Sequence, residues 1–131
     1  KEGKVFTPNG RARRFPRVKV DRWVASRNER QAINYNIHSY CSDIVLNMMV
    51  NLANNMQEIR GRLMLTVHDS VVFECPESEV EKLPDFLEKH ITEHIAEEFP
   101  DIPVPMTFGY KLGWNYGEMY SIKDWLNMSK E

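Results

Sequence analysis

The sequence of 131 residues contains only two cysteines and six glycines, and it has no long apolar segment. Two cysteines, Cys41 and Cys75, cannot build the dense disulfide framework of a small secreted domain, so we expect buried, reduced thiols in a cytoplasmic protein. No apolar run approaches the roughly 20 residues of a membrane span, and there is no signal-peptide pattern. Glycine-rich phosphate loops, internal repeats and low-complexity segments are also absent. The chain has no initiator methionine and the length of one domain or less, so we expect a processed or cloned piece.

Charge is distributed unevenly along the chain, although the net charge is only −2. Residues 1–30 hold ten Lys or Arg and three Asp or Glu, a net charge of +7, and residues 31–131 have a net charge of −9. A basic arm on a mildly acidic body indicates a polyanionic partner that binds one face. The alternative is an ordinary solvated surface.

The stretch Leu63–Glu74 reads L-M-L-T-V-H-D-S-V-V-F-E and predicts a β-hairpin. Residues 63–67 alternate with period two, and β-branched or aromatic residues follow Ser70, as expected for two paired strands. His68 and Asp69 then form the tip, where Asn-Gly or Asp-Gly would be the favoured pair. A charged residue at an unfavourable turn indicates a functional site. The alternative is that Asp69 caps its own backbone.

A basic strand is expected near the N-terminus. The turn signal Pro8-Asn9-Gly10 separates two short strand-like pieces. Arg11, Arg13 and Arg14 belong to the second piece, and arginine is well suited to contact phosphate.

Residues 27–60 have the periodicity of a helix, either unbroken or divided in two. Its apolar positions recur at intervals of three, four or seven and form one stripe: Ile33, Ile37, Cys41, Ile44, Met48, Leu52 and Ile59. Arg30, Asn34 and His38 form a second stripe, here called the polar row. The polar row can donate hydrogen bonds along a groove, unless it is only a solvated helix face.

A second helix is predicted within residues 78–99. Ser78 and Glu81 have the spacing of a capping box, and Pro84 suits the first turn of a helix that begins near Leu83. Its apolar residues form one stripe, which we expect to be buried: Val80, Leu83, Leu87, Ile91 and Ile95. Its acidic residues form the opposite face, which we expect to be solvated: Glu79, Glu88, Glu93, Glu97 and Glu98. We expect a strand at 104–110, a sharp turn at 111–117 and a short helix at 120–128.

The segment His90–His94 reads H-I-T-E-H and is a competing chemical signal. In an H-x-x-E-H helix, two histidines one turn apart bind zinc and the glutamate acts as a general base. The third ligand would have to be Asp101, Glu118, Asp124 or Glu131. A zinc hydrolase using His90, Glu93 and His94 is therefore a distant alternative, and a solvated helix face explains the pattern more simply.

Taken together, the motifs resemble the C-terminal palm of family A DNA polymerases, which include bacterial DNA polymerase I and its phage relatives. The matching segments follow the family's order over nearly the whole chain: Gly10-Arg11 to Pro16, Glu29–Asn34, Asp43-Ile44, Val67–Glu74 and Lys111–Asn115. The fold we expect is α+β, a partial palm that spans residues 1–131 as a single domain. It would contain a small antiparallel sheet with the His-Asp hairpin and helices packed on one face.

The resemblance implies template-directed transfer of nucleotides to a primer 3′-hydroxyl with two Mg²⁺ ions. Asp69 matches the family's metal-binding carboxylate at the hairpin tip, a hard oxygen ligand that suits Mg²⁺. His68 matches a residue near the primer terminus, and Ser70 occupies the next catalytic position.

The resemblance also implies the partners. Arg30, Asn34 and His38 match a row that follows the minor groove of primer–template DNA, whose acceptors are nearly independent of sequence. The expected partners are this DNA, deoxynucleoside triphosphates and the remainder of the polymerase, in the cytoplasm of a bacterium or a phage-infected cell.

The chain departs from the family pattern at two site residues and lacks two of the family's catalytic segments. Ser70 stands where Glu is usual and His38 where Gln is usual, so we expect weaker metal binding and a pH-sensitive groove contact. The family's first catalytic Asp and its nucleotide-binding helix have no counterpart here. We therefore expect part of a larger enzyme, a fragment or the subunit of a split polymerase, that is inactive alone. The alternative is a non-catalytic accessory subunit with a palm-like fold that binds nucleic acid.

Overall fold

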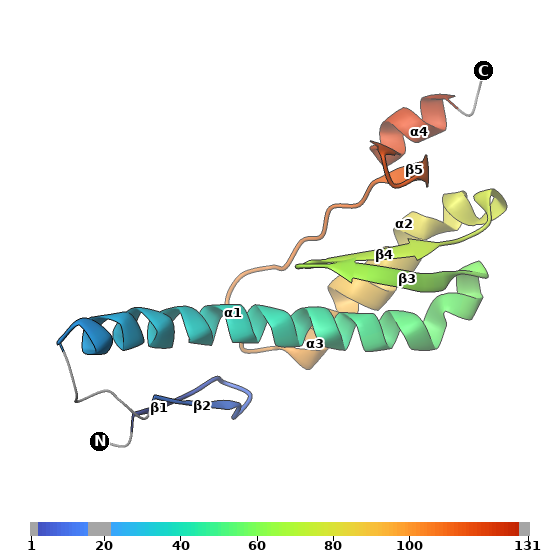
Figure 1. Ribbon diagram of the computed structural model, residues 1–131. Coiled ribbons are helices and arrows are strands. Elements are labelled where there is room, and N and C mark those ends of the chain that lie inside the picture. The colour runs from blue at the N-terminus through green and yellow to red at the C-terminus, as the bar shows by residue number, and fades with distance from the viewer. Residues whose placement is uncertain (1–2, 16–21, 129–131) are drawn as a thin grey trace.

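A single long helix is the axis of the fold. The computed structural model describes residues 3–15 and 22–128. Helix α1 (Arg22–Asn55) is 34 residues long and unbroken, which corresponds to a length of about 51 Å. Figure 1 shows the other elements arranged along both sides of α1. The long stretch of helical periodicity is therefore one helix and not two, and it ends in the short turn η1 (Met56–Ile59).

The strands form three antiparallel hairpins. They are β1 (Lys4–Phe6) with β2 (Ala12–Arg14), β3 (Arg62–Val67) with β4 (Ser70–Glu74), and β5 (Leu112–Asn115) with β6 (Glu118–Tyr120). Among the described residues, each hairpin is a separate two-stranded sheet. The α+β class and the antiparallel pairing are confirmed. The single sheet that we expected is divided into three.

The second helix contains a wide turn. The 3₁₀ turn η2 (Glu77–Lys82) leads into α2 (Leu83–Leu87), the π-helical turn η3 (Glu88–Glu93) and α3 (His94–Glu98). Its buried residues recur every four positions, at 83, 87, 91 and 95. In an α-helix this spacing rotates each residue about 40° from the one before, and a wide turn reverses part of that rotation. The π turn thus keeps the apolar stripe facing α1.

The predicted capping box does not form, because the hydroxyl of Ser78 binds a side chain outside the helix. Ser78 Oγ accepts a hydrogen bond of 2.8 Å from Arg60 Nη2, and Glu79 Oε1 accepts one of 2.8 Å from Arg60 Nε. Glu79 is buried and also pairs with Lys82. Lys82 and Arg60 hold the pKa of Glu79 below its ordinary value. The placement of Glu79 on the solvated face was therefore wrong, whereas the other four glutamates are exposed.

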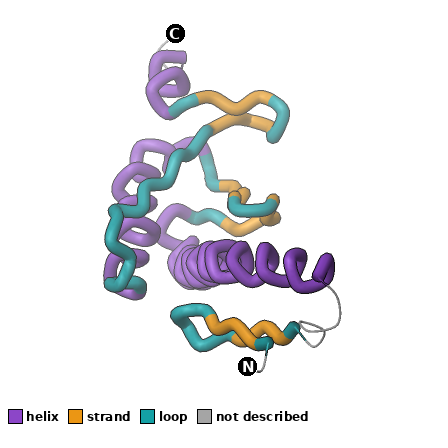
Figure 2. Tube along the Cα trace, turned by 90° about the vertical axis from the view of Figure 1, so that its left-hand side faces the viewer, coloured by secondary structure: helices purple, strands orange, loops and turns teal. Residues whose placement is uncertain are grey.

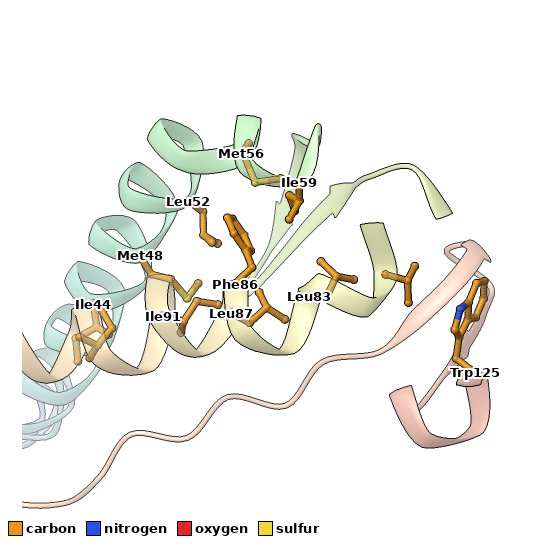
Figure 3. Packing of buried hydrophobic residues seen from close by; sticks show 12 residues of the cluster. Ile44, Met48, Leu52, Met56, Ile59, Leu83, Phe86, Leu87, Ile91 and Trp125 are labelled. Carbon is orange, nitrogen blue, oxygen red and sulfur yellow. The ribbon is translucent and has the colours of Figure 1, made fainter. Parts of the chain in front are cut away.

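The core lies between the C-terminal half of α1 and the second helix. Figure 3 shows Ile44, Met48 and Leu52 of α1 facing Phe86, Leu87 and Ile91. The predicted apolar stripe of the second helix is buried along its whole length, from Val80 to Ile95.

The apolar stripe of α1 is buried only in part. Ile33 and Ile37 are 66% and 61% exposed, and Cys41 is exposed as well. The second helix and the β3–β4 hairpin pack against the C-terminal half of α1, so they do not cover these positions (Figure 1). The expectation of buried thiols was therefore wrong for Cys41, and Cys75 is half-buried.

The C-terminal segment extends away from the core before it folds back. Residues 104–110 form no strand, contrary to the prediction, although Phe108 and Tyr110 pack against the core. The β5–β6 hairpin then leads to helix α4 (Ile122–Met128), which confirms the predicted last helix. Its Trp125 is buried, with its ring centroid 4.3 Å from that of Trp114. In the described ranges, no helix is long and apolar enough to span a membrane.

Candidate active site

The tip of the β3–β4 hairpin consists of His68 and Asp69, as predicted. Val67 pairs with Ser70, so the loop contains only two residues. His68 has a φ of 56°, a left-handed conformation that is unfavourable for a residue with a Cβ. Ser70 Oγ donates a hydrogen bond of 2.8 Å to the carbonyl oxygen of Val67 and closes the base of the loop. The tip is therefore strained and held in place by the strands.

The side chain of Asp69 is available for a ligand. It is exposed and has no hydrogen-bond or ion-pair partner among residues 3–15 and 22–128. A self-capping role, the alternative to a functional one, would need a hydrogen bond from the Asp69 carboxylate to the local backbone. No such bond forms in the described loop, where Ser70 makes the local contact instead.

A bulge separates the tip from the core. The register of β3 and β4 shifts between Leu63 and Leu65, so the regular alternation expected for β3 is interrupted at Met64. Leu63 packs against the core, but Leu65 and Val67 are 51% and 37% exposed. A bulge bends a strand and increases its twist. The outer half of the hairpin thus extends beyond the core.

The polar row lies on the same side of α1 as the hairpin tip. Arg30, Asn34 and His38 are exposed, and at about 100° per residue they share a helix face with Met48 and Leu52. Met48 and Leu52 belong to the core cluster against which Val71 and Phe73 of the hairpin pack. Figures 1 and 2 show the β3–β4 hairpin beside α1, with its tip over the middle of the helix and the N-terminal half extending past it. The two motifs, some 30 residues apart in sequence, therefore border one open surface. Arg30 Nη1 also donates to Ser26 Oγ at 2.9 Å.

The basic strand lies on the opposite side of α1. Figure 2 shows β1–β2 on one side of the helix and β3–β4 on the other. Arg11 pairs with Asp43 of α1, and Arg13 Nη2 donates to Gln31 Oε1 at 3.3 Å. Arg14 is exposed, with no hydrogen-bond or ion-pair partner in the described part of the chain. Contact of these arginines with phosphate stays a prediction, and two of the three already have protein partners.

The two histidines of the H-x-x-E-H segment have separate partners. His90 is buried, with its Nε2 3.2 Å from Glu58 Oε1, and His94 Nε2 is 2.7 Å from Asn47 Oδ1. His90 and Lys89 hold the pKa of Glu58 below its ordinary value, mainly through the hydrogen bond with His90. Among the described residues, no three His, Cys, Asp or Glu side chains gather to hold a metal ion. The described part of the chain therefore offers no support for a zinc hydrolase.

Sequence reasoning missed a groove beside the hairpin tip. A cavity of about 1370 Å³ lies between the hairpin, the second helix and the C-terminal segment, and Asp69, Ser70, Lys111 and Trp114 are among its lining residues. It also missed Asp43 as the partner of Arg11. The only sequence signal for Asp43 was an acidic residue within a motif that resembled a known family.

Comparisons with known proteins agree on one family. DNA polymerase family A matches residues 1–118. The DNA polymerase of Bacillus phage SP01 is 34% identical over 123 residues, which cover 88% of this chain and 13% of that protein. DNA polymerase I of Chloroflexus aurantiacus is 32% identical and covers 89% of this chain and 12% of that protein.

A solved structure has the same fold. The POL domain of Pol1 from M. smegmatis, in complex with DNA primer-template and dNTP, superposes with a TM-score of 0.63 at 31% identity. The match covers 70% of this chain and 17% of that chain. The chain spans about an eighth of the length of the two curated relatives above. Since the family match extends over most of the sequence, this chain belongs to DNA polymerase family A.

Proposed function

We propose that this chain is the C-terminal part of the palm domain of a DNA-directed DNA polymerase, which acts with the remainder of the enzyme in the cytoplasm of a bacterial or phage-infected cell. In this proposal it contributes one metal-binding carboxylate, Asp69, and a surface for primer–template DNA. The supporting observation is that Asp69 projects from a closed hairpin on the same side of α1 as Arg30, Asn34 and His38.

The residues at the tip fit a partial Mg²⁺ site. Mg²⁺ in phosphoryl-transfer enzymes is bound by one or two carboxylates together with water and substrate phosphates. Asp69 is one such carboxylate, and Ser70 is a weak oxygen ligand whose hydroxyl proton is already donated to Val67. The bound ions would activate the 3′-hydroxyl and neutralise the charge of the triphosphate. A second carboxylate would come from a part of the polymerase outside this chain.

The protein groups would orient the DNA end. His68 is held beside Asp69 by its two-residue loop, where it would contact the primer terminus. The polar row donates hydrogen bonds to the minor groove, whose N3 and O2 acceptors have similar positions in all base pairs. Such contacts bind a correctly shaped pair without reading its sequence.

Primer extension tests this function directly. With Mg²⁺, the chain alone is expected to extend no primer, and the chain together with the remainder of its polymerase is expected to be active. Extension by the chain alone would contradict the shared metal site, because it would require a second metal carboxylate within this chain. DNA binding without extension in both cases would favour the accessory subunit.

Arg30→Ala is expected to weaken primer–template binding by the complete polymerase roughly tenfold, since a specific arginine contact in a groove contributes about 1–3 kcal/mol. Fluorescence anisotropy with a labelled primer–template measures the dissociation constant. Lys123→Ala is the matched control, because it removes a positive charge from the exposed surface of α4. Equal affinities for Arg30→Ala and the unmodified enzyme would remove the polar row from the DNA surface.

A further inference from the structure

The base of the β3–β4 hairpin is held by one arginine. Arg60 follows η1 and precedes β3, and its φ of 49° is left-handed. Its guanidinium donates 2.8 Å hydrogen bonds to Glu79 and Ser78 of η2. Because η2 follows the end of β4 after only two residues, these contacts join the segment that leads into the hairpin to the segment that leaves it.

Glu79 is the buried member of this group, and both of its carboxylate oxygens are used. Oε1 accepts the hydrogen bond from Arg60 Nε, and Oε2 is 2.6 Å from Lys82 Nζ. Glu79 is only 5% exposed, whereas the side chains of Arg60 and Lys82 are each 63% exposed. A buried carboxylate that loses its cations is strongly destabilised, so Glu79 holds Arg60 in place. Arg60, Ser78, Glu79 and Lys82 are here called the base cluster.

The two ends of the hairpin also approach each other closely. A Cβ on Gly61 would lie 2.8 Å from the carbonyl oxygen of Glu74, so the backbones meet at a distance that only glycine permits. Arg62 pairs with Glu74 across the strands, but the two side chains are 72% and 54% exposed. An exposed pair of this kind contributes little. Arg62 thus resembles Arg60 in type and position but lacks a buried partner.

A small rotation at the base moves the tip by a catalytically important distance. The six residues of β3, at about 3.3 Å each, extend about 20 Å from the base to the tip. Over that length a rotation of about 3° displaces the tip by about 1 Å, and a misplacement of 1 Å can cost about 10²-fold in rate. Apolar contacts hold the inner half of the hairpin, but hydrophobic burial is non-directional. The hydrogen bonds of a planar guanidinium are directional.

We propose that Arg60 and Glu79 are positioning residues that set the direction of the β3–β4 hairpin and thereby place Asp69 for metal binding. The inference rests on the proposed function, which supplies the role of Asp69. Arg60 and Glu79 are nine and ten residues from Asp69 in the sequence, at the opposite end of the hairpin. They act on the metal site through the direction of the strands.

The Mg²⁺ dependence of primer extension by the complete polymerase tests this role. Arg60→Gly removes the guanidinium and keeps the left-handed turn, because glycine adopts that conformation without strain. We expect the Mg²⁺ concentration at half-maximal rate to rise about tenfold, the lower end of the effect of losing a residue that supports a metal ligand. Saturating Mg²⁺ is expected to restore the rate, whereas a variant that was merely less stable would lose rate equally at every Mg²⁺ concentration. An unchanged Mg²⁺ requirement in Arg60→Gly would overturn the proposal.

Three further variants separate the guanidinium from the backbone and from general charge. Glu79→Gln is expected to raise the Mg²⁺ requirement as Arg60→Gly does, since a neutral amide cannot pair with both cations. Arg60→Ala is expected to share this shift and also to melt at a lower temperature than Arg60→Gly, because alanine is strained in a left-handed turn. Arg62→Ala is the matched control and is expected to keep the normal requirement. A shift in Arg62→Ala as large as that in Arg60→Gly would contradict a specific role for the base cluster.

Hydrogen exchange tests the base cluster without metal or DNA. In the complete polymerase, Arg60→Gly and Glu79→Gln are each expected to accelerate amide exchange in residues 62–74 about fivefold, the size of effect that one partly exposed ion pair has on local opening. Arg62→Ala is expected to have a smaller effect. Unchanged exchange in both Arg60→Gly and Glu79→Gln would overturn the proposal.

The inference and the proposed function fail in different measurements. Normal primer extension by Asp69→Ala would contradict the proposed function, and the exchange of residues 62–74 would still report whether Arg60 and Glu79 hold the hairpin. Loss of extension in Asp69→Ala together with a normal Mg²⁺ requirement in Arg60→Gly would contradict the positioning role alone.

Discussion

Replacing Asp69 with alanine is expected to reduce primer extension by the complete polymerase by at least about 10³-fold, with little change in affinity for primer–template. A metal ion contributes several kcal/mol of charge stabilisation in a phosphoryl-transfer transition state, and about 4 kcal/mol corresponds to a factor of 10³. Asp69 is the carboxylate at the hairpin tip and has no described protein partner, so its replacement removes the proposed metal ligand without disturbing the fold. Single-turnover extension at saturating DNA measures the effect on the chemical step.

Two variants serve as controls for Asp69→Ala. Asp69→Asn keeps the shape of the side chain and removes its charge, so it should also be severely impaired. Asp85→Ala removes an exposed carboxylate from α2 and should extend primers normally. If Asp69→Ala retained more than a tenth of the normal rate, Asp69 would have no role as a metal ligand.

The largest effect on stability is expected for Leu52→Ala, which should lower the free energy of unfolding of the chain by about 2–5 kcal/mol. Leu52 is 1% exposed and lies on α1 where the helix faces Phe86 (Figure 3). Truncation removes buried apolar surface and leaves a cavity that the two packed helices cannot fill. Urea denaturation followed by circular dichroism measures the change in midpoint at constant slope.

Ile33→Ala is the matched control for Leu52→Ala, because it makes a similar truncation on the same helix at a position that is 66% exposed. We expect a change within about 0.5 kcal/mol, as for most surface substitutions. Alanine also has a higher helix propensity than isoleucine. A similar loss of unfolding free energy for Ile33→Ala and Leu52→Ala would mean that the N-terminal half of α1 is covered in solution.

Local sequence patterns predicted the helices and the central hairpin better than they predicted which side chains are buried by other elements. The period of α1 and the turn at His68-Asp69 depend on neighbouring residues, and both are confirmed. Periodicity alone places Ile33 and Ile37 in the same apolar stripe as Met48, and it contains no information on where a packing partner ends. For the same reason Glu79 was assigned to solvent, since its partner Arg60 is 19 residues earlier.

The candidate site was predicted as separate motifs. Each motif has its own sequence signal, but the shared side of α1 depends on how the β3–β4 hairpin lies along the helix. The pairing of Arg11 with Asp43 joins residues from a hairpin and a helix, so no periodicity reveals it. The strand expected at 104–110 is absent for a similar reason, because a strand needs a neighbour and none of the described segments pairs with it.

The π-helical turn at Glu88–Glu93 affects how this chain should be compared with its relatives. An i→i+5 turn encloses one residue more than an α-helical turn. Within this turn the carbonyl of His90 accepts a hydrogen bond of 2.8 Å from Asn51 Nδ2 of α1. A relative with a regular α-helix at this place would contain one residue fewer. It would still bury the apolar side chains that precede the turn and those that follow it. Aligning the two sequences then requires a one-residue gap inside a helix, where gaps are ordinarily penalised. An ungapped alignment would pair Leu83 or Ile95 with a solvent-facing residue and would hide a relationship that the structures retain.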